Sequence, residues 1–451
     1  MKGTLAAALG ALTASACQPA PSAPRATQLS SCDYQLELRQ SGEARVQASC
    51  DARGPMRFRI ARRSRAALRG VTLDERGRVA GSKLDYVVDL AKLSESGSFD
   101  VAARFGDSFI APLSSVLPVP EPHSGDVPVS VLVTPAAGVA AAVGLTRLAE
   151  PHSYRIAAHE LEVATYFAFG KLKQRPLSLG AATLELTQLD AELGVSFDQL
   201  AAWVTRSARA VAQFYGAFPV PRAAVTVLPR PGRDRVVFGK LLPESAPGIA
   251  LVVGQAATER ALDQDWILIH ELFHLGFPSF NGEGKWLDEG LATYYEPIIR
   301  VRAGLYSERE LWRELAQSLP LGLPAFTGAG LEAAPDFRGV YWGGALACLL
   351  ADVTARQRQL DVGLEAGLRA VWRAGGHASE VRSLAETIAT IDGALGAPTL
   401  APIAAAHAPR GSAFDLEALL MQLGVQRSGE GVTLSDSAPL AAVRRAITGP
   451  L

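Results

Sequence analysis

The order of sequence patterns along the chain predicts an α+β fold with a β-rich front, a mixed α/β middle and a mostly helical back. The front, residues 32–190, carries short alternating runs such as YQLELRQ and ARVQASC. Turns containing Gly, Ser and Asp separate these runs, as is typical of strands. From Ser196 onwards the apolar residues recur at helical spacing, and Ser196 is a natural N-cap. We therefore expect a second unit, residues 191–451, that combines helices with a few strands.

The middle of the chain places two candidate strands, AAVTVL and GIALVVG, ahead of a long predicted helix from about Thr258 to Gly276. The earlier run HELEV, which begins at His159, alternates like a strand and is interpreted as one. Further on, Ser307 and Glu310 have the spacing of a capping box, so another helix is expected to begin there.

Length and charge narrow the functional classes. The chain has 451 residues, which suits two or three domains. Its 44 basic and 45 acidic residues nearly balance, and no basic run stands out. Proteins that bind nucleic acid normally carry a basic patch, so no nucleic-acid partner is expected.

The first residues are typical of an export signal. Residues 1–16 combine a charged start, the apolar stretch Leu5–Leu12 and a small-residue cleavage pattern that ends at Ala16. Cys17 follows at once and resembles the lipidated first residue of a bacterial lipoprotein; ordinary cleavage after Ala16 is the alternative. Residues 17–31 are rich in Pro, Ala and Ser, as a flexible tether is. We expect an exported protein of the bacterial cell envelope, anchored to the membrane through Cys17.

The other cysteines fit an oxidising compartment. Cys348 lies in the apolar helical stretch GALACLLADV, where a free thiol is often simply buried. This leaves Cys32 and Cys50 as a candidate disulfide that closes a short loop. Two unpaired thiols are the alternative.

The segment WILIHELFHLG carries the strongest chemical signal. His270 and His274 are four residues apart, so both imidazoles leave one face of a helix and suit a tetrahedral zinc ion. Glu271, next to the first histidine, is then expected to act as the general base on a zinc-activated water molecule. The alternative is a buried helix with two incidental histidines.

A catalytic zinc needs a third protein ligand, and the next segment offers one. Glycines and a proline break the helix, and KWLDEGLATYYEPIIR begins another that returns the chain to the metal at Glu289. Asp288 competes for the role but points roughly 100° away on a helix. Glu296, two turns further on, is expected to accept the free N–H of a ligand histidine, and an exposed carboxylate is the alternative.

HELFH followed by WLDEGLATYYE resembles the gluzincin zinc metallopeptidases, including the aminopeptidase N and glycyl aminopeptidase families. The resemblance covers roughly 196–356. It implies a thermolysin-like catalytic middle, one zinc on His270, His274 and Glu289, and Glu271 as the base. VYWGGALACLLADVTAR resembles the Y-x-K/R-G-A helix of these families, which implies that Tyr341 stabilises the oxyanion. Gly343 stands where those families carry Lys or Arg.

The expected activity is zinc-dependent hydrolysis of peptide bonds in a peptide or protein. The alternatives are an inactive binding or scaffold lipoprotein with a peptidase fold, or a zinc hydrolase acting on another substrate. The acidic anchor with which related aminopeptidases hold a free amine is not visible, because the corresponding stretch contains only Glu244. Cleavage at chain ends or within chains therefore stays open. GIALVVG is expected to be an exposed sheet edge that aligns the substrate.

Overall fold

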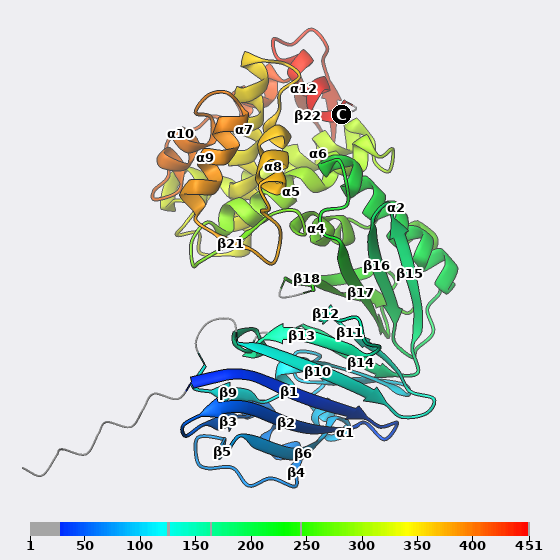
Figure 1. The fold of residues 1–451 in the computed structure, drawn as a ribbon. Helices are drawn as coiled ribbons and strands as arrows, with labels where there is room; N and C mark the ends of the chain where they lie inside the picture. The colour runs from blue at the N-terminus through cyan, green and yellow to red at the C-terminus, as the bar shows by residue number, and fades with distance from the viewer. Residues whose placement is uncertain (1–27, 124–126, 163–164, 244–245, 450–451) are drawn as a thin grey trace, which may run out of the picture.

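The chain folds into a β-rich front, a mixed sheet and a helical back that follow one another in sequence and stack from bottom to top in Figure 1. The computed structural model describes residues 28–123, 127–162, 165–243 and 246–449. The predicted α+β class is confirmed. The predicted signal 1–16, Cys17 and Glu244 lie outside the described residues. The first strand begins at Gln28, inside the segment predicted to be a tether.

The front is built on one large sheet with the order β12-β13-β10-β1-β2-β6-β4. Its strands are β1 (Gln28–Leu38), β2 (Glu43–Arg53), β4 (Leu68–Arg69), β6 (Lys83–Asp89), β10 (Pro128–Pro135), β12 (Thr146–Arg147) and β13 (Ser153–Ala157). Alternate side chains of β1 and β2 are buried, as the alternation in the sequence predicts.

Two smaller sheets pack with the large one, in the orders β11-β14-β8-β7 and β5-β3-β9. Their strands are β3 (Arg57–Arg59), β5 (Arg78–Ala80), β7 (Ala103–Phe105), β8 (Ser108–Pro112), β9 (Val119–Glu121), β11 (Ala140–Val143) and β14 (Tyr166–Gly170). Short helices connect them: η1 (Arg62–Ala67), α1 (Leu90–Leu93), η2 (Ser94–Ser96), η3 (Leu113–Ser115) and η4 (Ala158–Glu162).

Residues 159–162 of the HELEV run lie in η4 and not in the predicted strand. The side chain of Glu160 turns back and accepts the backbone N–H of Ala157 at 2.9 Å, and this local bond competes with strand pairing. The strand expected there begins only at Tyr166.

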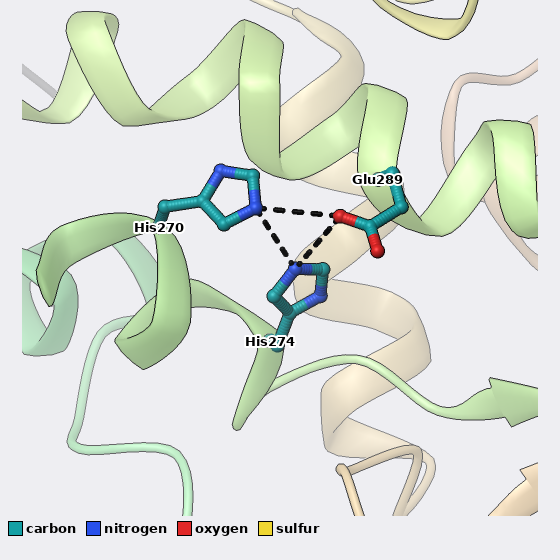
Figure 2. A group of neighbouring side chains, drawn as sticks. All are labelled: His270, His274 and Glu289. Carbon is teal, nitrogen blue, oxygen red and sulfur yellow. Dashed lines mark hydrogen bonds and ion pairs between the residues drawn. The ribbon is translucent and has the colours of Figure 1, made fainter. Parts of the chain in front are cut away.

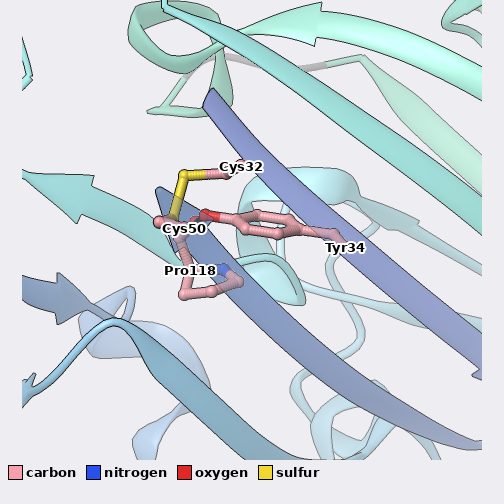
Figure 3. Close-up of a disulfide and its surroundings, with 4 residues drawn as sticks. All are labelled: Cys32, Tyr34, Cys50 and Pro118. Carbon is pink, nitrogen blue, oxygen red and sulfur yellow. Dashed lines mark hydrogen bonds between the residues drawn. A yellow bond between two sulfur atoms is a disulfide. The ribbon is translucent and has the colours of Figure 1, made fainter. Parts of the chain in front are cut away.

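A disulfide joins Cys32 and Cys50, which face each other across β1 and β2 (Figure 3). Beside it, the Tyr34 hydroxyl donates a hydrogen bond of 2.9 Å to the carbonyl of Pro118. Both contacts lie in the buried core of the front, so they tie the first strand to its neighbours. Cys348 is buried and has a free thiol.

The middle is a mixed sheet with the order β15-β16-β17-β19-β18. Its strands are β15 (Lys173–Leu179), β16 (Ala182–Gln188), β17 (Arg222–Arg230), β18 (Val236–Leu242) and β19 (Gly248–Gly254). The predicted helix after Ser196 is confirmed as α2 (Phe197–Tyr215), and Ser196 closes a capping box with Gln199. GIALVVG is β19, which pairs with β17 on one side and β18 on the other. The prediction that it forms an exposed edge is wrong, because the edge strand is β18.

The predicted long helix from about Thr258 to Gly276, which carries the metal motif, is also divided. It consists of α3 (Glu259–Asp263) and α4 (Ile267–His274). The division falls where the carboxylate of Asp265 accepts the backbone N–H groups of Ile267 and Leu268, at 3.2 and 2.9 Å. A carboxylate that satisfies free N–H groups in this way starts a new helix, so α4 has its own beginning.

The back consists mainly of helices, of which α6, α7 and α12 contact α5 directly. The helices are α5 (Lys285–Arg302), α6 (Glu308–Ser318), α7 (Gly344–Arg358), α8 (Leu364–Arg373), α9 (Leu384–Ala394), α10 (Leu400–His407), α11 (Leu416–Gln422) and α12 (Ala441–Thr448). The shorter elements are β20 (Ser279–Phe280), η5 (Leu319–Gly322), η6 (Ala325–Ala329), η7 (Gly339–Gly343), β21 (Val381–Arg382), β22 (Val425–Ser428) and β23 (Gly431–Leu434). The predicted capping box at Ser307 and Glu310 is present. No described helix combines the length and hydropathy that crossing a membrane requires.

The front contacts the middle sheet through a small apolar cluster that includes Tyr166 and Leu228. A second contact reaches β18 itself. Lys240 pairs with Asp100 at 2.9 Å, and the rings of Phe238 and Phe99 lie 6.0 Å apart. The edge strand of the middle is therefore held in part by the front.

Candidate metal centre

Three side chains converge between α4 and α5, as Figure 2 shows. The Nε2 atoms of His270 and His274 are 3.3 Å apart, and Oε2 of Glu289 lies 3.4 and 3.6 Å from them. Ligand atoms about 2.0–2.2 Å from a tetrahedral zinc are roughly 3.3–3.6 Å from one another. The donor types and their separations therefore fit a zinc ion held by the three residues that the sequence analysis predicted, with a fourth position left for water or substrate.

The histidine helix is fixed by packing on its far side. Leu272 and Phe273 are fully buried, and the hydroxyl of Tyr215 on α2 donates to the carbonyl of Phe273 at 3.0 Å. The chain then leaves the helix at Gly276, where a Cβ would lie 2.3 Å from the ring of Tyr215. Only glycine fits this close approach, so the end of α4 is set by its contact with α2.

The helix that carries Glu289 is held at its start and in its middle. Glu332 accepts the backbone N–H of Gly284 and, at 2.7 Å, the indole N–H of Trp286. One residue after the ligand, a Cβ on Gly290 would lie 2.4 Å from the backbone of Gly344 on α7. These contacts fix the position of α5, and with it the position of Glu289 opposite the histidines.

Asp288 supports the metal site from behind. Its Oδ1 lies 2.9 Å from Nδ1 of His274, so Nδ1 carries the proton that bonds to the carboxylate and Nε2 is left free for a metal. The sequence assigned this kind of support to Glu296, and the structure does not. Glu296 is buried and, among the described residues, bonds to Arg300 at 3.2 Å. On the helix, Asp288 points roughly 100° away from Glu289. This direction excluded Asp288 as a predicted ligand, and it brings the carboxylate to the outer side of His274.

The site has the electrostatics of a cation-binding group. Burial opposes a charge on His274, but Asp288 and Glu289 outweigh it and raise the pKa of His274 well above its usual value. Burial likewise opposes a charged Glu289, but the two histidines outweigh it and hold the pKa of that carboxyl well below its usual range. In both cases a neighbouring group of opposite charge outweighs the cost of burial.

Glu271 lies on α4 with the two histidines, but its side chain is held by the strand opposite. Its Oε2 accepts the backbone N–H of Leu241 on β18 at 2.8 Å. A Cβ on the neighbouring Gly239 would lie 2.7 Å from Cγ of Glu271, so the strand approaches the helix closely only because that residue is glycine. Burial raises the pKa of Glu271, and the histidines oppose this rise. The carboxylate is thus oriented by a backbone group, which no side-chain pattern in the sequence reveals.

Tyr341 reaches the site from η7. Its ring is stacked on that of His270, with centroids 5.8 Å apart and planes 5° from parallel. Burial raises the pKa of its phenol, and the nearby Glu289 raises it further, so the hydroxyl keeps its proton and is a hydrogen-bond donor. At Gly343, where the resembling families carry Lys or Arg, a Cβ would lie 2.8 Å from the side chain of Leu331. A long side chain has no room there.

A cleft of about 490 Å³ opens over these residues. Its helical side carries the two histidines, Glu271, Asp288, Glu289 and Tyr341; its opposite side is β18, from Phe238 to Leu241. Lys285 also lines it. The cleft can therefore hold an extended chain between a wall of reactive side chains and the backbone of an edge strand.

The chain is similar to known proteins in its structure, whereas its sequence matches none of the families or curated proteins compared. An aminopeptidase N family protein from Idiomarina loihiensis has a TM-score of 0.66 at 12% identity, covering 88% of this chain and 78% of that one. An M1 zinc metallopeptidase from Deinococcus radiodurans has a TM-score of 0.54 at 15% identity, covering 86% and 96%. The chain thus has the fold of the two-domain M1 zinc metallopeptidases, in agreement with the gluzincin resemblance.

One further similar structure contains a peptide substrate. A variant of the Deinococcus radiodurans metallopeptidase bound to a Tyr-Ser-Ala substrate has a TM-score of 0.53 at 14% identity, covering 86% of this chain and 96% of that one. At these identities the likeness concerns the fold.

Proposed function

We propose that the protein is a zinc metallopeptidase that hydrolyses peptide bonds, with one zinc on His270, His274 and Glu289 and Glu271 as the general base. The observation that carries the proposal is the triangle of donor atoms with sides of 3.3, 3.4 and 3.6 Å, beside which stands a carboxylate that is not itself a ligand. A fold neighbour bound to a tripeptide substrate supports a peptide as the substrate class.

Each residue then has a separate task. Zinc, when bound, supplies a Lewis acid that lowers the pKa of water and polarises a carbonyl group. Glu271, oriented by the N–H of Leu241, takes the proton from the water and returns it to the leaving amine. The Tyr341 hydroxyl donates a hydrogen bond to the substrate oxygen on which negative charge develops. Asp288 holds the ring of His274 in the orientation and tautomer that a metal ligand needs.

We also propose that this chemistry takes place outside the cytoplasm, in a protein exported by residues 1–16 and anchored through a lipid on Cys17. The disulfide between Cys32 and Cys50 supports the proposal, because such bonds persist in oxidising compartments. Labelling with a fatty-acid analogue tests it: the wild type is expected to take up the label and Cys17→Ala to lose it. A free amino group at Cys17 in an unlabelled protein would contradict the anchor.

The activity is tested with the full exported protein loaded with zinc and a diverse peptide mixture, with cleavage positions read by mass spectrometry. We expect cleavage that stops when a chelator removes the metal and returns when zinc is restored. Intact peptides in the presence of stoichiometric zinc would overturn the peptidase proposal and favour a binding role or a non-peptide substrate. The cleavage positions also show whether chain ends or internal bonds are cut.

A further inference from the structure

The two helices that carry the metal ligands (Figure 2) are joined a second time, away from the metal. Arg300 lies on α5, about 16 Å further along the helix axis than Glu289. Its Nη2 donates a hydrogen bond of 3.3 Å to the backbone carbonyl of Gln264, in the short link between α3 and α4. One guanidinium therefore reaches from the helix of Glu289 to the beginning of the helix that carries both histidines.

The beginning of α4 is fixed at this point by Asp265. The carboxylate of this residue accepts the backbone N–H groups of Ile267 and Leu268, at 3.2 and 2.9 Å. Burial raises the pKa of Asp265 to about 6, while these N–H groups and the positive charge of Arg300 oppose the rise. Arg300 thus binds the carbonyl group before the cap of α4 and stabilises the charge of the cap itself.

The guanidinium of Arg300 is held in place from α5 and α6. Its Nη1 donates to the carboxylate of Glu296, one turn earlier on α5, at 3.2 Å. Its central carbon lies 4.1 Å from the centre of the Tyr306 ring, whose hydroxyl donates to Glu314 on α6 at 2.9 Å. Arg300 and Glu296 are only 5% and 3% exposed. The planar guanidinium therefore has a fixed position and direction.

Net stability does not account for this buried arginine. Taking charges out of water costs so much that apolar side chains of similar volume often stabilise a protein as well or better than a buried ion pair does. In some proteins a buried polar group instead fixes the arrangement of the elements that it joins. Two helices that meet only at a metal ion can pivot about it, whereas a second link at a distance fixes the angle between them.

We infer that Arg300 is a positioning residue for the metal centre. By linking the beginning of α4 to α5, it fixes the angle between these helices and so the distances from Glu289 to the two histidines. This inference rests on the proposed function, which places the zinc ion on these three ligands. Arg300 is not among the residues that line the cleft, so it acts through the helices and not on the substrate.

The first test measures the geometry of the site with cobalt(II) in place of zinc in the full exported protein, because its visible absorption depends on the arrangement of the ligands. Arg300→Lys keeps the positive charge but lacks the planar fork that bonds to Gln264 and Glu296. We expect a changed cobalt spectrum and zinc binding that is weaker by about tenfold in competition with a chromogenic chelator. Glu296→Gln keeps an oxygen that accepts from Arg300 and should bind zinc as the wild type does.

Arg302→Lys is the matched control. The Arg302 side chain is as buried as that of Arg300 and lies on the same helix, but its described partners are Glu365 on α8 and the carbonyl of Ile447 on α12. This variant should lower the melting temperature as Arg300→Lys does and keep the wild-type cobalt spectrum and zinc affinity. A wild-type spectrum in Arg300→Lys, or an equal change in both variants, would reduce Arg300 to a stabilising residue and overturn the inference.

A second variant keeps the inference testable if Arg300→Lys does not fold. Asp265→Asn keeps an oxygen that can cap α4 but loses the negative charge that Arg300 stabilises. It should change the cobalt spectrum in the same way as a weakened link does, and to a smaller extent than loss of the arginine would. In that case a spectrum identical to that of the wild type would contradict the link.

Kinetics separate this inference from the peptidase proposal. In Arg300→Lys loaded with zinc, kcat for a cleaved peptide should fall by about tenfold with KM unchanged, because the ligands are misplaced and the cleft lining is not. A wild type that binds cobalt but cleaves nothing overturns the peptidase proposal and leaves the spectroscopic test of Arg300 intact. A wild type that binds no cobalt overturns the metal centre, on which both proposals rest.

Discussion

The two walls of the cleft contribute in different ways. The helical wall, formed by α4, α5 and η7, supplies side chains: two imidazoles, three carboxylates and a phenol. The strand wall, β18, supplies a backbone N–H at Leu241 and, at Gly239, a backbone without a side chain that approaches α4 closely. Function on the helical wall depends on which side chain is present. On the strand wall it depends on where the backbone runs, so substitutions there should alter positioning and leave the metal in place.

The largest effect is expected on the helical wall. His270→Ala combined with His274→Ala removes two of three ligands, so the protein should lose its zinc completely. Metal analysis of the purified protein measures this, and circular dichroism checks that the large apolar core keeps the fold. Stoichiometric zinc in the double variant would show that the metal is held elsewhere.

Glu271→Gln comes next. The amide cannot accept a proton from water, so kcat should fall by about a hundred- to ten-thousand-fold while the zinc content stays at one per chain. Steady-state kinetics and metal analysis on the same sample separate the two readouts. Full activity in this variant would exclude Glu271 as the base.

Tyr341→Phe should have a smaller effect of about a hundredfold on kcat, because one donor to the developing oxyanion is lost and the metal still holds that oxygen. The ring remains stacked on His270, so zinc content should not change. A rate equal to that of the wild type would reduce Tyr341 to a packing residue.

Asp288→Asn should weaken zinc affinity by about 10- to 100-fold, as the loss of a carboxylate behind a ligand histidine typically does. Competition with a chromogenic chelator gives the affinity. Glu296→Gln is the matched control, because it changes a carboxylate on the same helix that bonds to Arg300. A weaker zinc site in the control and not in Asp288→Asn would restore the role that the sequence suggested for Glu296.

The smallest effect is expected on the strand wall. Gly239→Ala places a methyl group within 2.7 Å of the Glu271 side chain and should lower kcat by about tenfold through misplacement of the base, with zinc unchanged. Gly393→Ala, where a Cβ meets nothing within 4 Å, is the control. Loss of zinc in Gly239→Ala would show that the two walls are not separable.

The difference between the helical wall and the strand wall also explains which parts of the site could be predicted from the sequence. His270 and His274 follow from helical spacing, which is a local property of the chain, and Glu289 follows from the turn and returning helix and from the gluzincin resemblance. The prediction that β19 is an edge strand was wrong because strand order is set by long-range pairing. The segment VVFGKLL, which forms the edge strand β18 beside it, was not among the predicted strands. Helical geometry correctly gave Asp288 a direction away from the metal, but only the fold shows that the outer side of His274 lies there.

The contact of Asp100 and Phe99 with β18 bears on how the chain can be divided. The sequence suggests a border near residue 190, and a gene fragment beginning there would encode all the metal ligands and the base. It would also leave Lys240 and Phe238 without their partners from the front, and these two residues flank Gly239 next to Glu271. We therefore expect the two parts to work as a single unit, because the front contacts the strand that orients Glu271.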